Sequence, residues 1–189
     1  GTGIAPMMEA ARLIALSGAK PKRTILFVGF AGEEFGLLGA KAFCERHKDK
    51  LGKIANLFNR DGGPTPPVGI SVPKAMYDDF VEICKPIKEI NPEYPFEVTI
   101  AQPRKKPTTM GGTDASVFAV KGVPTYGFRE QDFKGYNFNY GEIWHTERDL
   151  YTKSIPEYME HTSVVTAIVA LGVANLKHQL SREGMYTDQ

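Results

Sequence analysis

Three acidic side chains and one imidazole stand in the sequence at places where they could bind a metal ion. Glu33 and Glu34 follow directly on one apolar run, Asp61 follows a second, and His145 lies in a segment without helical periodicity. Zinc accepts carboxylate oxygen and imidazole nitrogen, and a catalytic zinc keeps one coordination position for water. A further carboxylate beside such a metal can take a proton from that water. These residue types are therefore those of a hydrolytic metal site.

Each of these residues also has an ordinary structural explanation. Adjacent glutamates are stabilised at the solvated start of a helix by the helix dipole. Asp61 precedes two glycines, and Asp-Gly is common turn chemistry. The other histidines, His47, His161 and His178, fall in helical stretches beside polar neighbours and are expected on the surface. Residue type and spacing alone leave both explanations open.

The segments that would position these residues alternate between helical and strand patterns. Periodicity predicts helices at 4–17, 35–48, 74–90 and 114–121, and a last helix that starts with the capping-box residues Ser154 and Glu157 and carries an apolar stripe to Leu180. Apolar runs predict strands at 24–30, 54–59, 96–101 and 123–127, with loops at 102–110 and 129–144. Pro86 is expected to kink or shorten its helix. The alternation predicts an α/β fold whose ligands bind beyond the carboxyl ends of the strands.

Composition excludes several other classes of protein. The 189 residues are 42% hydrophobic with a net charge of +1, which suits one domain with a sizeable core and disfavours a nucleic-acid partner. No apolar run approaches the roughly 18–20 residues of a membrane span. Cys44 and Cys84 could be two buried thiols or one disulfide.

Several motifs, taken in order, resemble the zinc-dependent exopeptidase family typified by bacterial leucyl aminopeptidases. Residues 32–40 read Gly-Glu-Glu-Phe-Gly-Leu-Leu-Gly-Ala, with Ala40 where that family usually has Ser. Asp61, Gly112-Thr113-Asp114, Gly122-Val123-Pro124 and His145-Thr146-x-x-Asp149 follow in the family's order. The resemblance covers essentially the whole chain. It implies a three-layer sandwich with a mostly parallel mixed sheet between helices.

The resemblance also implies a role for each site residue. Glu33 would be the general base, Glu34 and His145 would bind one zinc, and Asp61 would bind a second. A bridging aspartate and one more histidine would come from upstream and are absent from this sequence. Asp114 and Asp149 would lie just behind the ligands, and Ala115 stands where the family often has a histidine.

A substrate pocket is implied by the same resemblance. Its residues would be Met110, Thr113, Phe128 and Trp144, with Phe133 or Phe138 nearby. Apolar side chains of this kind favour a hydrophobic or aromatic terminal residue on a peptide with a free N-terminus. A complete domain would hold two zinc ions.

Residues 1–189 are expected to be the C-terminal major part of one catalytic domain. With only these ligands, the isolated chain is expected to bind zinc weakly and to be inactive, and an exposed sheet edge would favour association. The resemblance implies a secreted or periplasmic protein.

Two alternatives to an aminopeptidase remain open in the sequence, besides carboxypeptidase specificity. A glutaminyl-peptide cyclase would use one zinc and similar ligands for acyl transfer on an N-terminal glutamine. A non-catalytic ectodomain would keep the fold and lose the metals, although Glu33, Glu34, Asp61 and His145 are all present.

Overall fold

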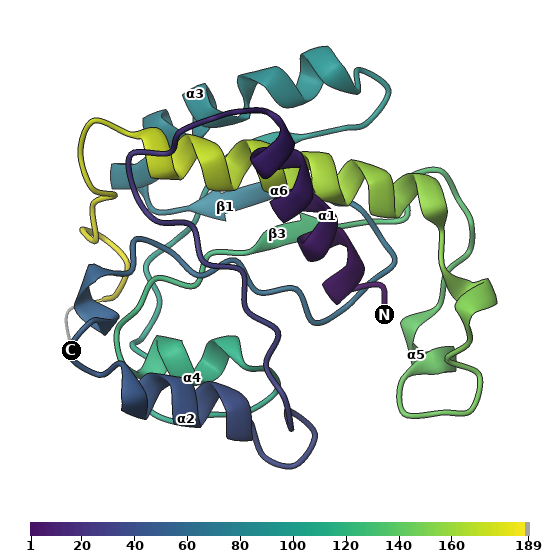
Figure 1. The fold of residues 1–189 in the computed structure, drawn as a ribbon, viewed down its shortest axis with the longest axis horizontal. Helices are drawn as coiled ribbons and strands as arrows, with labels where there is room; N and C mark the ends of the chain where they lie inside the picture. The colour runs from purple at the N-terminus through teal and green to yellow at the C-terminus, as the bar shows by residue number, and fades with distance from the viewer. Residues whose placement is uncertain (188–189) are drawn as a thin grey trace.

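The computed structural model describes residues 1–187 and shows a small sheet flanked by helices (Figure 1). The helices are α1 (Ile4–Leu16), α2 (Leu38–Arg46), α3 (Lys74–Ile90), α4 (Ala115–Val120), α5 (Tyr140–Ile143) and α6 (Pro156–Asn175), with 3-10 turns η1 (Leu51–Lys53) and η2 (Tyr151–Lys153). The strands are β1 (Pro67–Val72), β2 (Glu97–Ile100) and β3 (Phe128–Glu130). Among these described residues, no helix combines the length and apolar character that crossing a membrane requires.

The described strands form one mixed sheet in the order β2-β1-β3. β1 pairs in parallel with β2, with Gly69 opposite Glu97, and antiparallel with β3, with Ile70 opposite Phe128. α3 connects the parallel pair, as a βαβ unit requires. The predicted α/β class is confirmed, with one parallel and one antiparallel pairing in this small sheet.

The larger core lies between the sheet, α3 and α6, which run across the same face in Figure 1. Met76, Phe80, Ile83 and Ile87 recur on α3 at spacings of three and four, and all are buried. Pro86 does not shorten α3, which continues to Ile90. Burial of this apolar stripe is what holds the helix on the sheet.

A smaller core joins α2 to α4, which lie side by side in Figure 1. Ala40 and Cys44 of α2 are buried with Val117 and Phe118 of α4. Cys84 belongs to the larger core, so the two cysteines are separate free thiols. Burial raises the pKa of the Cys84 thiol to about 12.

Three of the four predicted strands differ from the structure. Residues 24–30 make no backbone hydrogen bond to any other described residue, and residues 54–59 and 123–127 contact each other without forming a named strand. Their contact is one backbone bond, from Leu57 N to Pro124 O at 2.8 Å, and two bonds of the Asn56 side chain to the backbone of Tyr126. Strand formation needs a partner at the right register, which apolar composition does not supply.

The sheet uses two segments that the sequence patterns did not mark as strands. β1 contains Pro67 and Gly69, which weaken the strand signal, while β3 overlaps the start of the segment 129–144 that was predicted as a loop. β2 lies inside the predicted strand 96–101. Pairing with β1 decides the conformation of both neighbours.

Two helix starts and one histidine were also predicted incorrectly. Residues 33–37 form a turn before α2, so Phe35 is exposed and does not pack on the core. The capping box is absent because Ile155 is the N-cap of α6 and Glu157 instead pairs with Lys134. His161 is buried on α6, and Leu180 is buried beyond the end of that helix.

Candidate metal centre

One pocket of about 540 Å³, lined by five separate segments of the chain, contains most of the predicted site residues. The predicted residues that line it are Glu33, Glu34, Asp61, Met110, Trp144, His145 and Asp149. Residues 1–3, Lys41 and Tyr140 complete much of its wall. The fold therefore brings Glu33, Glu34, Asp61 and His145 from distant parts of the sequence into one pocket.

Glu33 and Glu34 stand on a tight turn that leads into α2. The Glu33 carbonyl accepts hydrogen bonds from Gly36 N at 3.0 Å and Leu37 N at 2.8 Å. Gly39 N donates to Ala31 O at 2.9 Å, and a Cβ at Gly39 would lie 2.7 Å from the same oxygen. Glycine at this position is thus required for the turn that presents both carboxylates.

His145 follows the single-turn helix α5 and faces Glu34. The Asn139 side chain accepts a hydrogen bond from Gly141 N at 3.0 Å and caps α5. His145 has φ +56°, a left-handed conformation uncommon for a non-glycine residue. Its Nε2 lies 3.1 Å from Glu34 Oε1 and 3.0 Å from Oε2. The pair joins an imidazole nitrogen and a carboxylate at contact distance.

Like charges are concentrated around this pair. The pKa of Glu33 is raised, first by burial and then by the negative charges of Asp61, Glu34 and Asp114. The pKa of Asp114 is raised by burial and by Asp61, and its buried Oδ1 has no hydrogen-bond partner among the described residues. A bound cation would relieve this repulsion, because it favours the charged form of every nearby carboxylate.

Among the described residues, the side chains that could bind zinc are of the right chemical types, but too few of them lie close together. Glu34 and His145 supply oxygen and nitrogen ligands side by side, as zinc prefers. Asp61 faces the same pocket. Across residues 1–187, no group of three or more potential ligands lies close enough to hold one ion. The residues therefore fit part of a metal site, with Glu34 and His145 at its centre.

Three predicted site residues do not line the pocket. Thr113 Oγ1 accepts a hydrogen bond at 2.6 Å from Nδ2 of Asn59, which precedes Asp61 by two residues. Asp114 is buried at the start of α4. Phe128 stacks on Phe58 at 5.7 Å between ring centroids and packs against the larger core. A side chain in β3 points to one face or the other of the sheet, and pairing with β1 turned this one inward.

Tyr140 and Lys41 are pocket residues that the sequence patterns did not single out. The pKa of the Tyr140 phenol is raised, first by burial and then by the charges of Asp61, Glu34 and Glu33, so it stays a neutral hydrogen-bond donor. Its position in an aromatic stretch just before His145 was the available signal. Nothing in the local pattern around Lys41 indicated its place.

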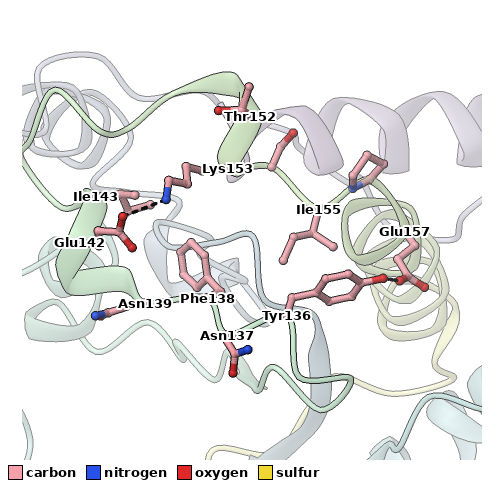
Figure 2. Close-up of a pocket in the computed structure, with 12 residues that line it drawn as sticks. Tyr136, Asn137, Phe138, Asn139, Glu142, Ile143, Thr152, Lys153, Ile155 and Glu157 are labelled. Carbon is pink, nitrogen blue, oxygen red and sulfur yellow. Dashed lines mark hydrogen bonds and ion pairs between the residues drawn. The ribbon is translucent and has the colours of Figure 1, made fainter.

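A second cavity of about 320 Å³ lies on the other side of α5, and Ile143 lines both (Figure 2). In Figure 2 the Phe138 ring lies along its wall, near Lys153, which pairs with Glu142 at 2.9 Å. Tyr136 donates a hydrogen bond to Glu157 at the far end of the view. Phe133 lies in neither cavity and instead packs on Tyr94 and Tyr158.

Comparison with known proteins finds similarity to peptidases. Residues 1–169 match the sequence profile of the family described as Peptidase family M28. Carboxypeptidase Q of Mus musculus is 30% identical over 182 residues, which cover 96% of this chain and 36% of that protein. A probable zinc metalloprotease of Pyrenophora tritici-repentis is 43% identical over 60 residues, 32% of this chain and 13% of that protein.

Solved structures agree with this sequence likeness. A Peptidase M28 precursor from Shewanella amazonensis SB2B superimposes with a TM-score of 0.74 at 28% identity, covering 95% of this chain and 38% of the other. The LapA aminopeptidase of Legionella pneumophila gives a TM-score of 0.63 at 20% identity, covering 94% and 46%, which shows the fold alone. The chain spans only about a third of the length of the curated relatives it matches over most of its own length.

Proposed function

This chain belongs to peptidase family M28, and on that premise we propose that the protein is a zinc-dependent exopeptidase. The observation that carries the proposal is the pocket in which Glu33, Glu34, Asp61 and His145 meet. These are the groups that peptide hydrolysis by a metal-bound water requires.

Each of these side chains receives a distinct task in the proposal. Glu34 and His145, already in contact, would hold one zinc, and Asp61 would hold a second. Bound zinc would supply Lewis-acid polarisation of the peptide carbonyl and lower the pKa of a coordinated water. Glu33 would accept the proton from that water and pass it to the leaving amine. In this proposal Asp114 and Asp149 would lie behind the ligands as supporting carboxylates.

We favour aminopeptidase over carboxypeptidase specificity because of the charge of the pocket. Besides Glu34 and Asp61, the two carboxylates that would hold metal, the pocket contains Glu33 and Asp149, and both would attract a free ammonium group. Met110 and Trp144 offer apolar surface for the side chain of the substrate's N-terminal residue, whereas Phe128 packs against the larger core and is not available to the substrate. The relatives named carboxypeptidase Q make the opposite polarity the alternative to test.

The central experiment separates the two adjacent glutamates. Glu33→Gln should leave zinc content unchanged and reduce turnover about 10²–10⁴-fold, the usual contribution of a general base. Glu34→Gln should lower zinc content itself. Zinc is measured by elemental analysis of the natural full-length protein, and turnover with aminoacyl anilides. If both variants keep zinc and activity, the assignment is wrong.

A histidine pair supplies a matched control for the ligand assignment. His145→Ala should reduce zinc content, whereas His47→Ala, on α2's C-terminal end, should leave it unchanged. Equal zinc content in the two variants would remove His145 from the ligand set.

Peptides blocked at one terminus show whether the enzyme cleaves from the N-terminal or the C-terminal end. A free N-terminus should be required and an amidated C-terminus tolerated if the protein is an aminopeptidase. The reverse pattern would establish a carboxypeptidase. One zinc per chain together with cyclisation of N-terminal glutamine would instead identify the cyclase reaction.

The family resemblance also favours action outside the cytoplasm, in a secreted or periplasmic compartment. Fractionation of cells that produce the natural protein tests this. Recovery of the activity only from the cytoplasmic fraction would contradict it.

A further inference from the structure

Next to Asp61, a buried arginine makes an ion pair that the proposed chemistry does not use. Arg60 Nη1 lies 2.5 Å from Glu130 Oε1, and the Arg60 side chain is only 3% exposed. Isolating a charge from water in this way is costly unless it is paired and hydrogen-bonded. Such a pair therefore constrains the backbone on which it stands.

The pair closes the turn that follows Asp61. Arg60 Nη2 also donates to Thr65 O at 2.7 Å, and Thr65 Oγ1 donates to Glu130 Oε2 at 3.3 Å. Glu130 itself is fixed, since it ends β3 opposite Pro67 of β1. One guanidinium thus ties both ends of the segment 60–65 to the rigid sheet.

The other side of this turn packs against the first residues of the chain. A Cβ on Gly3 would lie 3.0 Å from Arg60 O, and a Cβ on Gly63 would lie 2.7 Å from Thr2 Oγ1. The segment carrying Asp61 is therefore held between residues 2–3 and the Glu130 carboxylate. Little freedom remains for it to move as a rigid unit.

Arg60 and Asp61 send their side chains to different places. Asp61 lines the metal pocket, whereas Arg60 does not and is enclosed beside Glu130. We propose that Arg60 and Glu130 are a positioning pair that aims the Asp61 carboxylate at the second metal. The inference rests on the proposed function, because it takes Asp61 to be a ligand.

The expected size of the effect follows from how ligands are supported in metal sites. Groups that orient a ligand without touching the metal typically change metal affinity about 10–100-fold when they are removed. Here the loss should fall on the metal held by Asp61, while the one held by Glu34 and His145 should keep its affinity. A selective loss of one metal is the signature of positioning.

The test is Glu130→Gln in the natural full-length protein, with zinc titrated by calorimetry into the metal-free form. We expect the zinc held by Asp61 to bind about 10–100-fold less tightly. The melting temperature in EDTA should also fall, because the buried Arg60 guanidinium loses its charged partner. Glu97→Gln is the matched control, because Glu97 pairs with Arg129 on the same sheet at 3.7 Å and away from the pocket. It should leave both zinc affinities unchanged.

A double variant separates positioning from simple stability. Arg60→Met with Glu130→Leu replaces the buried pair with apolar groups of similar size, a change that often preserves or raises stability. It should fold and still show the weakened zinc, because nothing then holds Thr65 O. It also keeps the test decisive if Glu130→Gln fails to fold.

Two outcomes overturn the inference, and Asp61→Asn tells them apart. If Asp61→Asn loses one zinc while folded Glu130→Gln and the double variant keep normal affinity, the positioning pair is wrong and the proposed function stands. If Asp61→Asn keeps both zinc ions, the ligand assignment itself is wrong and the inference falls with it.

Discussion

Two apolar segments of this chain, β1 and residues 24–30, have opposite surroundings. In β1, Ile70 is fully buried between two strands and the helices α3 and α6. In the other segment Leu26 is 65% exposed, and the backbone has no hydrogen-bond partner within residues 1–187. The difference lies in the partners each segment finds, not in its own apolar content. A strand sequence is stabilised only where a neighbour completes its hydrogen bonds and covers its side chains.

The strongest contrast should appear when large side chains are truncated. Phe80→Ala removes a fully buried ring from α3 beside β1 and should cost about 3–5 kcal/mol in the free energy of unfolding. Leu26→Ala should change it by less than about 0.5 kcal/mol. Urea unfolding of the 189-residue chain measures both. A comparable loss in the two variants would mean that residues 24–30 are covered in solution.

The β1 region should also respond to acid. His161 is buried on α6, accepts a hydrogen bond at Nδ1 from Asn91 at 2.8 Å, and has its pKa lowered by burial to about 4. An unfolded histidine titrates near 6.5, so between these values only the unfolded chain takes the proton. Stability should therefore fall as the pH drops from about 6.5 to 4, by about 3 kcal/mol.

Substitution of that histidine tests the assignment. In His161→Phe this part of the acid loss should disappear, while His47→Gln should keep it. The measurement is the free energy of unfolding between pH 4 and 7. An unchanged pH profile in His161→Phe would show that another group titrates.

Close packing between α6 and α3 should show as intolerance of one added methyl group. A Cβ at Gly172 would lie 2.5 Å from Cγ2 of Ile83, so Gly172→Ala should lose about 1–3 kcal/mol despite alanine's better helix propensity. Gly52→Ala, with open space around its Cβ, is the control and should change stability little. Thermal unfolding separates the two. A stabilising Gly172→Ala would mean that the helices move apart easily.

The smallest expected effect concerns association through residues 24–30. Residues 24–30 combine apolar side chains with a backbone that has no hydrogen-bond partner within residues 1–187, which favours pairing with a second copy of the chain. Leu26→Glu should therefore weaken self-association of the 189-residue chain about tenfold, or about 1.4 kcal/mol. Tyr151→Glu alters a more exposed side chain elsewhere and should have no effect. Sedimentation at several concentrations measures this. Equal association in both variants would place the contact on another surface.

Local patterns predicted the features that depend on neighbours in sequence. The helices at 4–17, 74–90 and 114–121 were predicted within a few residues because their apolar stripes recur at helical spacing. The motif around Glu33 and Glu34, together with Asp61 and His145, predicted residues that the structure brings to one pocket. Their chemical roles remain proposals.

What the sequence determined by itself is thus the fold class, the family and the residue types of the site, because periodicity and motifs are local properties. The tertiary structure alone decided that β1 and β3 are strands, that Phe128 and His161 are buried, and that Arg60 meets Glu130. Each of these depends on a partner far along the chain, and Arg60 and Glu130 stand 70 residues apart. Strand register and side-chain burial are set by such distant contacts, whose closure no local pattern encodes.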